Sequence, residues 1–461
     1  MDLGVDFSAV LKKSLSNGGD FADIFIERSS PLAIVCEDDR VEKVLSGREW
    51  GAGVRLVIGQ RTAYAYTNEV TTDSLLELAE VVRQAATENA HQTDINLCKK
   101  NARVDLPVRR DPDHVDTSQK TGMVLQANKA ARGFDRCIRQ VLVTYRENRQ
   151  HVIIASSDGF IAEDERMYLT ALVNVVVSQG DVVQTGYEAI GGIAGWELFD
   201  ASALTQVAET AARRAVMMLT AQKAPAGRMP VVLSSEAGGT MIHEAVGHGL
   251  EADLVQSGLS VYSHLMGQRI ASPLISVVDD ATLEGRRGSF RFDDEGVDAQ
   301  RTVLVDKGIL KTFLYDRLTA VKDGVRSTGN GRRESYKYRP IPRMTNTMIV
   351  PGEFDPGNIL RSTPKGLYVK KMGGGEVNTV NGDFVFEVSE GYRIENGTIG
   401  EPVRGATLTG NGPQVLMSID QVGTDLGFSI GTCGKDGQGS PVSDAQPTLR
   451  IPEMTVGGVI G

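Results

Sequence analysis

The stretch His243-Glu244-Ala245-Val246-Gly247-His248 places two histidines five residues apart, with a glutamate directly after the first. In the common H-E-x-x-H zinc motif the histidines are four residues apart and share one face of a regular helix. A spacing of five turns the second imidazole away by roughly 140°. A π-bulge accommodates one extra residue in a helix, and such bulges are frequent at functional sites. The stretch therefore predicts a two-histidine metal site on a helix that is broken or π-turned around Ala245–Gly247, where Gly247 is best suited to the distortion.

A catalytic zinc needs three protein ligands and one open position for water. His243 and His248 would supply two ligands, and Glu244 would act as general base on the zinc-bound water. Cys433 is a candidate third ligand because a thiolate binds zinc strongly, although a lone cysteine is more often a small buried apolar residue. The residues alone leave the third ligand open, since other candidates follow the motif: Glu251, Asp253 and His264.

The segment Lys223–Pro230 contains two prolines and one glycine, and it separates a helical pattern from an apolar strand pattern. Such a composition is typical of a connection between structural units. We therefore predict an N-terminal domain over residues 1–222, a linker over 223–230 and a C-terminal domain over 231–461. Ser234 and Ser235 follow the linker as candidate N-caps for the helix that carries the histidines.

Hairpin and helix patterns alternate in the N-terminal part. Gly59-Gln60 separates two strand patterns, Gly53–Ile58 and Arg61–Thr67, and a helix with an N-cap at Thr72/Asp73 follows. A later hairpin turns at 179–181 and precedes a helix from about Asp200 to Thr220. These patterns predict an α/β-type layered domain with mainly antiparallel hairpins and helices.

Hairpin signals dominate the C-terminal part, at residues 306–308, 381–383 and 395–397. Long strand patterns between such signals indicate an antiparallel arrangement. We therefore predict an α+β protein of two domains, in which a β-rich antiparallel C-terminal domain carries the metal-site helix.

The 461 residues carry a net charge of −10, which argues against nucleic-acid binding. No run approaches the roughly 18 apolar residues of a membrane span, and Met1–Asp6 shows no start of a signal peptide. The four cysteines are too few and too scattered for a disulfide scaffold. We expect a cytoplasmic protein that contacts neither nucleic acid nor membrane.

Two glycine-rich stretches resemble nucleotide-binding motifs only in part. Gly434-Lys435 lacks the first glycine and the final Ser/Thr of a phosphate-binding loop, because Ser429 and Asp436 occupy those positions. The run Gly373–Gly375 has no following helix pattern, so a dinucleotide site is not supported. We expect both stretches to form loops where one backbone approaches another.

Further stretches, together with the histidine motif, resemble the TldD family of the TldD/PmbA (TldD/TldE) zinc metallopeptidases. The resemblance extends over nearly the whole chain, with Leu254–Met266 matching less well. The stretches are Asp20–Asp23, Gly51–Thr67, Ser235–Glu251, Thr328–Tyr336, Pro342–Thr347, Gly431–Gly439 and Pro447–Ile451.

This resemblance implies a zinc peptidase in which Cys433 completes the site of His243, Glu244 and His248. It also implies peptide substrates that are unfolded or flexible, and a dimer, either a homodimer or a heterodimer with a PmbA/TldE-like chain. The PmbA/TldE branch lacks the histidine motif, so this chain resembles the catalytic branch. Asn330, Arg332 and Arg333 are candidate substrate contacts.

Two alternatives remain beside this interpretation. Dipeptidyl peptidase III has the same spacing of histidines but takes its third ligand from a glutamate on a second helix, and nothing else in this chain resembles it. The other alternative is a non-catalytic peptide-binding or assembly module with a structural zinc. A closed site with a fourth protein ligand would favour that module.

Overall fold

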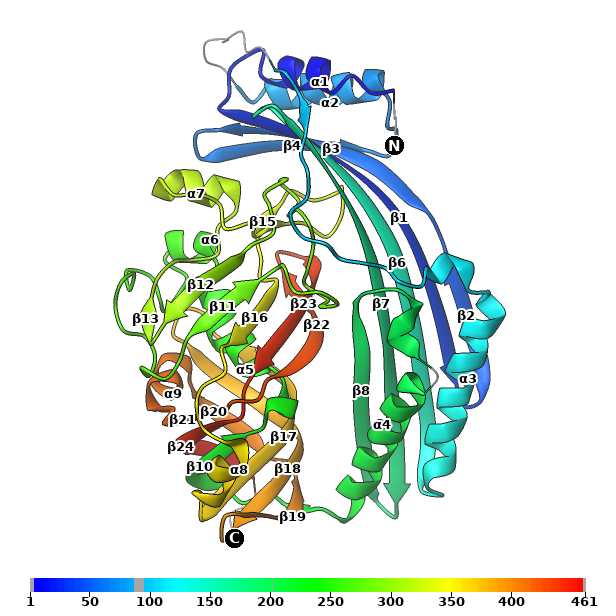
Figure 1. Ribbon diagram of the computed structural model, residues 1–461, viewed down its shortest axis with the longest axis vertical. Helices are drawn as coiled ribbons and strands as arrows, with labels where there is room; N and C mark the ends of the chain where they lie inside the picture. Colours follow the sequence, from blue (N-terminus) through cyan, green and yellow to red (C-terminus); the bar gives the residue numbers. More distant parts are fainter. Residues whose placement is uncertain (1–3, 87–94, 201, 459–461) are drawn as a thin grey trace.

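The computed structural model describes residues 4–86, 95–200 and 202–458 (Figure 1). These residues form two eight-stranded sheets, one six-stranded sheet and one two-stranded sheet, with helices packed against them. The mixture of helices with mostly antiparallel strands confirms the α+β prediction. None of the described helices is long and apolar enough to cross a membrane.

The first sheet is built from the N-terminal part of the chain and has the order β4-β3-β1-β6-β7-β5, with β2 beside β1 and β8 beside β7. All of its pairings are antiparallel except that of β5 with β7. Figure 1 shows β1, β6 and β7 as long, curved strands that reach along the whole molecule. The strands are β1 (Phe21–Glu37), β2 (Arg40–Ser46), β3 (Glu49–Ile58), β4 (Arg61–Thr67), β5 (Cys98–Lys99), β6 (Ile138–Ser156), β7 (Phe160–Gln179) and β8 (Val182–Ile193).

Two pairs of helices cover this sheet, each over its own apolar cluster. Helices α1 (Phe7–Ser14) and α2 (Thr72–Arg83) pack on one end, and α3 (Thr117–Phe134) and α4 (Ala203–Thr220) on the other. The predicted hairpin at Gly59-Gln60 is confirmed, and the predicted helices correspond to α2 and α4. The short 3-10 turn η1 (Pro112–His114) precedes α3, and the 3-10 turn η2 (Trp196–Phe199) precedes α4.

The second eight-stranded sheet has the order β17-β10-β24-β20-β18-β19-β9, with β21 beside β24. Its pairings are mostly antiparallel, but β10 runs parallel to β17 and β19 runs parallel to β9. The strands are β9 (Gln222–Lys223), β10 (Gly227–Leu233), β17 (Lys365–Val377), β18 (Asp383–Glu395), β19 (Thr398–Arg404), β20 (Thr407–Asn411), β21 (Gln421–Val422) and β24 (Leu449–Gly457). The residues expected to form a linker thus include the end of β9 and the beginning of β10.

The six-stranded sheet has the order β13-β12-β11-β16-β23-β22, and β16 and β23 run parallel. Its strands are β11 (Val277–Asp280), β12 (Arg301–Asp306), β13 (Ile309–Leu310), β16 (Asn346–Ile349), β22 (Gly427–Lys435) and β23 (Gln438–Gln446). A separate ribbon pairs β14 (Gly331–Arg332) with β15 (Ile341–Pro342).

A helical segment carries the histidine motif into the core shared by these two C-terminal sheets. Met241, Val246 and Leu250 are fully or almost fully buried there. The helical elements of this half are η3 (Ser235–Ala237), α5 (Thr240–Ile242), η4 (His243–Gly247), η5 (His248–Leu250), α6 (Ala252–Gln256), α7 (Arg317–Asp323), α8 (Pro356–Arg361) and α9 (Gly412–Ser418).

The two glycine-rich stretches form strands, so the prediction of loops is wrong. Gly373–Gly375 lies in β17, and Gly434-Lys435 ends β22. A Cβ at Gly375 would lie 1.9 Å from Cδ1 of Phe386, so the glycine allows the neighbouring strand's ring to approach. The turn after β22 is tight because Asp436 and Gly437 both have positive φ.

Candidate metal centre

The helix that carries the motif widens into a single π-turn over His243–Gly247. The N–H of His248 donates to the carbonyl of His243, five residues earlier, and the helix then ends in the 3-10 turn η5. The two imidazole centroids lie 5.1 Å apart with their planes at 89°. The predicted π-turn around Ala245–Gly247 is therefore confirmed, and it places both histidines on one side of the segment.

Close packing, and not an unusual backbone conformation, explains why a glycine occupies position 247. Its φ of −54° and ψ of −54° are ordinary helical values that any residue adopts. A Cβ at this position, however, would lie 1.9 Å from Sδ of Met344, which is completely buried. The hydroxyl of Tyr262 donates to the carbonyl of Ala245 at 2.9 Å, so a carbonyl within the π-turn has a partner.

The beginning of this segment also differs from the prediction. The hydroxyl of Ser234 accepts a hydrogen bond from Glu236 N–H and thereby caps the short turn η3. The residue before α5 is Gly239, where a Cβ would lie 2.3 Å from the backbone nitrogen of Ala445. Helix α5 thus begins without a side-chain cap, at a glycine that packs closely against β23.

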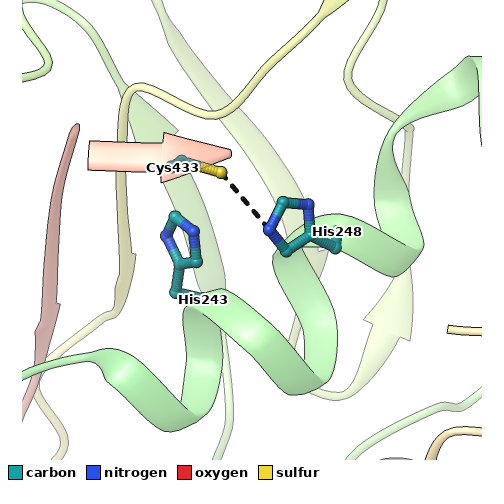
Figure 2. Close-up of side chains that lie close together, drawn as sticks. All are labelled: His243, His248 and Cys433. Atoms are coloured by element: carbon teal, nitrogen blue, oxygen red, sulfur yellow. Dashed lines mark hydrogen bonds between the residues drawn. The ribbon is translucent and has the colours of Figure 1, made fainter. Parts of the chain in front are cut away.

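Cys433 reaches the two histidines from β22, the edge strand of the six-stranded sheet (Figure 2). Its Sγ lies 3.3 Å from Nε2 of His248, and one possible ligand atom from each of the three residues lies within 4.8 Å of the others. Over the described ranges, this is the group of His, Cys, Asp and Glu side chains close enough to share a metal ion.

The other candidates for a third ligand occupy different places. Oε2 of Glu251 lies 3.1 Å from Nδ1 of His248, the ring nitrogen that does not contact Cys433, and 3.1 Å from Nζ of Lys435. Asp253 pairs with the same lysine at 2.7 Å. His264 is exposed. Sequence reasoning had not foreseen Glu251 and Lys435 as a charged pair behind His248.

Electrostatics favour the thiolate form of Cys433. Burial opposes ionisation, but hydrogen bonds from His243 and His248 outweigh it and lower the pKa of the thiol to about 5. Burial likewise opposes the charge of Glu251, while Lys435 and His248 lower the pKa of that carboxyl to about 2. At neutral pH the site therefore contains the charge state of cysteine that binds metals.

Nδ1 of His243 has no hydrogen-bond partner among the described residues. This buried Nδ1 lies 3.9 Å from Oδ2 of Asp444. The other carboxylate oxygen of Asp444 accepts from Gly239 N–H at 2.9 Å and from the Ser429 hydroxyl. Asp444 thus joins the start of the helical segment to the strands that bear Cys433.

The donor set fits a zinc ion. Tetrahedral zinc with imidazole and thiolate ligands requires donor atoms about 3.3–3.8 Å apart. The separation of 3.3 Å between Nε2 of His248 and Sγ of Cys433 agrees with this requirement for that pair, and the donor atom of His243 lies within 4.8 Å of both. The contact of Glu251 with the far nitrogen of His248 matches the carboxylate–histidine–metal arrangement that orients such ligands.

Glu244 lies beside the three residues in a cavity of about 680 Å³. Its side chain is 25% exposed, and Oε2 lies 3.9 Å from Nε2 of His248. Burial raises the pKa of this carboxyl, against the opposing effect of the two histidines. The carboxylate is therefore placed where it can contact both the candidate ligands and a molecule in the cavity.

A second cavity of about 820 Å³ adjoins the first, and both are lined by Tyr187, Ile430, Gly431 and Thr432. Arg332 and Arg333 line this second cavity. Asn330 is 1% exposed, and its amide donates to Asp279 at 2.7 Å and to the carbonyl of Arg343 at 3.0 Å. The structure therefore brings two of the three candidate substrate contacts to a cavity and gives Asn330 internal partners.

Three family models match successive parts of the chain. They describe domain 1, the central domain and the C-terminal domain of the PmbA/TldA metallopeptidases, and they match residues 22–86, 110–219 and 226–458. Among curated relatives, a metalloprotease TldD homolog of Haemophilus influenzae is 38% identical over 95% of this chain and 93% of its own length. A zinc metalloprotease TldD homolog of Saccharolobus solfataricus is 29% identical over 98% of this chain and 99% of its own length.

Solved structures show the same fold at lower identity. A protein of Thermotoga maritima described as a candidate modulator of a DNA gyrase superposes with a TM-score of 0.79 at 21% identity, over 95% of this chain and 96% of the other. TldE of Thermococcus kodakarensis gives a TM-score of 0.76 at 17% identity, over 98% of this chain and 99% of the other. With family models along the chain and relatives above 30% identity, the chain belongs to the TldD/PmbA family of metallopeptidases and is a metalloprotease.

Proposed function

We propose that this chain is a zinc-dependent peptidase whose metal is held by His243, His248 and Cys433. The observation that carries the proposal is the convergence of these three donors beside Glu244 in one cavity. A histidine pair alone also occurs by chance. A preformed thiolate and a carboxylate-oriented imidazole in the same place are what a metal centre requires.

In this proposal Glu244 is the general base. A bound zinc ion would polarise the carbonyl of the scissile bond and lower the pKa of a water molecule. Glu244 would take the proton from the attacking water and pass it to the leaving amine. Its raised pKa suits this exchange, because a base with a pKa closer to neutral also serves as an acid.

The substrates in this proposal are unfolded or flexible peptides. A chain in an extended conformation spans about 3.3 Å per residue and can follow the two adjoining cavities, whereas a folded domain cannot enter them. We further propose a cytoplasmic protein that forms a homodimer or a heterodimer with a TldE-like chain. Residues 1–222 and 231–461 would be its two domains, joined through 223–230.

The alternative, a non-catalytic module with a structural zinc, calls for a fourth protein ligand. Among the described residues, the candidate cluster contains three side chains that offer a ligand atom. Three protein ligands beside a cavity correspond to a catalytic zinc with one open position. The open cavity next to Glu244 thus favours the peptidase over the module.

The test is the variant Glu244→Gln, which removes the base and keeps the shape of the side chain. We expect it to bind zinc with the wild-type stoichiometry, measured by elemental analysis, while cleavage of an unstructured peptide falls by about 10²–10⁴-fold. Glu236→Gln is the matched control, because Glu236 is an exposed glutamate in the neighbouring turn η3. Cleavage by Glu244→Gln at the wild-type rate, with or without a partner chain, would refute the assignment.

A further inference from the structure

Arg287 lines the second cavity beside Gly431 and Thr432, which line both, and among the described residues its guanidinium donates to uncharged oxygens. Nε donates to the carbonyl of Gly431 at 3.2 Å, Nη1 to the hydroxyl of Thr170 at 2.8 Å and Nη2 to that of Thr432 at 3.3 Å. A guanidinium has five N–H donors in a planar fork, so two remain after these three bonds. Arg287 is thus a fixed cation with spare donors.

Arg332 contacts the same part of the β22–β23 hairpin. It is 3% exposed, and its guanidinium donates to the carbonyls of Met344 at 2.6 Å and Pro441 at 2.7 Å. Pro441 is the strand partner of Thr432, which Arg287 contacts. Two arginines therefore converge on the rung of the hairpin that directly precedes Cys433.

Arg146 is the third cation at this place. It is exposed on β6, directly opposite Thr170 on β7, and it lines the second cavity together with Arg287 and Arg332. Burial lowers the pKa of Arg287, and repulsion from Arg332 and Arg146 acts in the same direction. Arg287 is therefore close enough to each of the other two guanidinium groups to be repelled by it.

The carboxylates that line this cavity are bound to other groups. Glu147 pairs with Lys120 at 2.6 Å, Asp294 with Arg166 at 2.8 Å and Glu49 with Lys337 at 3.8 Å. Glu27 accepts from Gln150 and from the N–H of Tyr336, and Glu334 from that of Gly439. Across the part of the chain that the structure describes, no ion pair within 4.0 Å joins a carboxylate to Arg146, Arg287 or Arg332, and Asp294, which is paired with Arg166, attracts Arg332 from farther away.

We propose that Arg146, Arg287 and Arg332 form a subsite for a substrate carboxylate, so that the peptidase selects peptides with a negative charge near the scissile bond. Thr432 directly precedes Cys433 in β22 and lines both cavities, so an extended peptide that is cleaved beside Cys433 can bring this carboxylate to the arginines. It is either an Asp or Glu side chain or the free C-terminus of the peptide. This inference rests on the proposed peptidase function.

The experiment compares matched flexible peptides. One series carries Glu or Gln at each successive position around one cleavable bond, and a second series ends in a free or an amidated C-terminus. We expect the wild type to cleave the charged member of at least one pair with a kcat/KM about 10–100-fold higher, the usual effect of hydrogen bonds to a charged group. The series that shows the preference identifies the source of the carboxylate.

Arg146→Gln should remove most of this preference with little effect on folding, because Arg146 is exposed. Arg139→Gln is the matched control, since Arg139 is an exposed arginine on the same strand that lines neither cavity. Arg287→Lys keeps the charge but loses the planar fork, so we expect an intermediate preference. Equal kcat/KM for charged and neutral peptides in the wild type would overturn the proposal, as would equal loss in Arg146→Gln and Arg139→Gln.

Binding of the labelled peptides to the Glu244→Gln protein separates this inference from the peptidase function. A charge preference in binding that falls with added salt and disappears in the double variant Glu244→Gln/Arg146→Gln supports the subsite, even if no peptide is ever cleaved. Cleavage of charged and neutral peptides alike, with no preference in binding, overturns the subsite and leaves the peptidase function standing.

Discussion

Glu251 Oε2 lies 3.1 Å from Nδ1 of His248, while Nε2 of the same ring faces Sγ of Cys433 at 3.3 Å. The carboxylate therefore holds a hydrogen on Nδ1, so that Nε2 offers its lone pair to a metal once it gives up the hydrogen that it donates to the thiolate in the metal-free site. Glu251 is itself completely buried and lies 3.1 Å from Nζ of Lys435, two residues after Cys433. The cysteine strand thus supplies both a candidate ligand and the cation that holds the carboxylate behind the histidine.

Glu251→Gln should weaken zinc binding about 10–100-fold, because it removes the charge that strengthens His248 as a ligand. A competition titration against a chromophoric chelator measures this change. Asp253→Asn is the control, since Asp253 contacts Lys435 but not the histidine. Equal zinc affinity of Glu251→Gln and the wild type would show that Glu251 does not act through His248.

The thiol of Cys433 in the metal-free protein should titrate with a midpoint of about pH 5. Because this pKa lies below the ordinary value of 9.0, the ionised sulfur stabilises the fold; this contribution is complete above pH 9 and is lost as the pH falls through about 5. The ultraviolet absorbance of the thiolate follows the titration, and Cys433→Ser should abolish it. His243→Ala and His248→Ala should each raise the midpoint, and an unchanged midpoint in both would contradict the proposed hydrogen bonds.

Gly247→Ala should destabilise the protein by about 1–3 kcal/mol, because the new methyl group would overlap Met344 in a packed core. Urea unfolding gives the free energy. Gly122→Ala is the matched helical control: a Cβ there meets nothing within 4 Å, so we expect stabilisation of about 0.4–1 kcal/mol. If both variants changed stability equally, the explanation for Gly247 would be wrong.

Tyr262→Phe tests whether the hydrogen bond from the Tyr262 hydroxyl stabilises the π-turn. Removal of the hydroxyl leaves the carbonyl of Ala245 without its donor, so we expect a loss of about 1–3 kcal/mol in the free energy of unfolding. Tyr315→Phe provides a comparison, since its hydroxyl donates to the carboxylate of Asp323 instead of to the π-turn. We also expect weaker zinc binding in Tyr262→Phe alone, measured by the same chelator competition.

The parts of the site predicted from sequence are those that a local pattern encodes. The spacing of His243 and His248 predicts the π-turn, because a regular helix would separate the two rings. The glycines around Cys433 suggest a loop, yet Gly431 and Gly434 lie in strand β22, and the spacing rule does not connect Cys433 to the histidines. In the sequence that assignment rests on the family resemblance, because the residues alone leave Glu251, Asp253 and His264 open.

Long-range contacts are the parts that sequence reasoning missed. The contact of Lys435 with Glu251 links residues far apart in the chain, and no periodicity signals it. Asn330 lies in a charged stretch and is a candidate substrate contact by sequence, but the side chain is buried against Asp279. A run of charged residues in the sequence shows which side chains are present. Whether one of these side chains is buried depends on which strands cover it in the fold.

The separation of His248 and Cys433 by 185 positions has a consequence for the order in which the centre forms. During synthesis both histidines leave the ribosome long before the cysteine does. A nascent chain can therefore bind a metal through two ligands at most, and the third arrives only with the last strands of the C-terminal half. The proposed hydrolytic activity thus requires a chain that has been synthesised beyond Cys433.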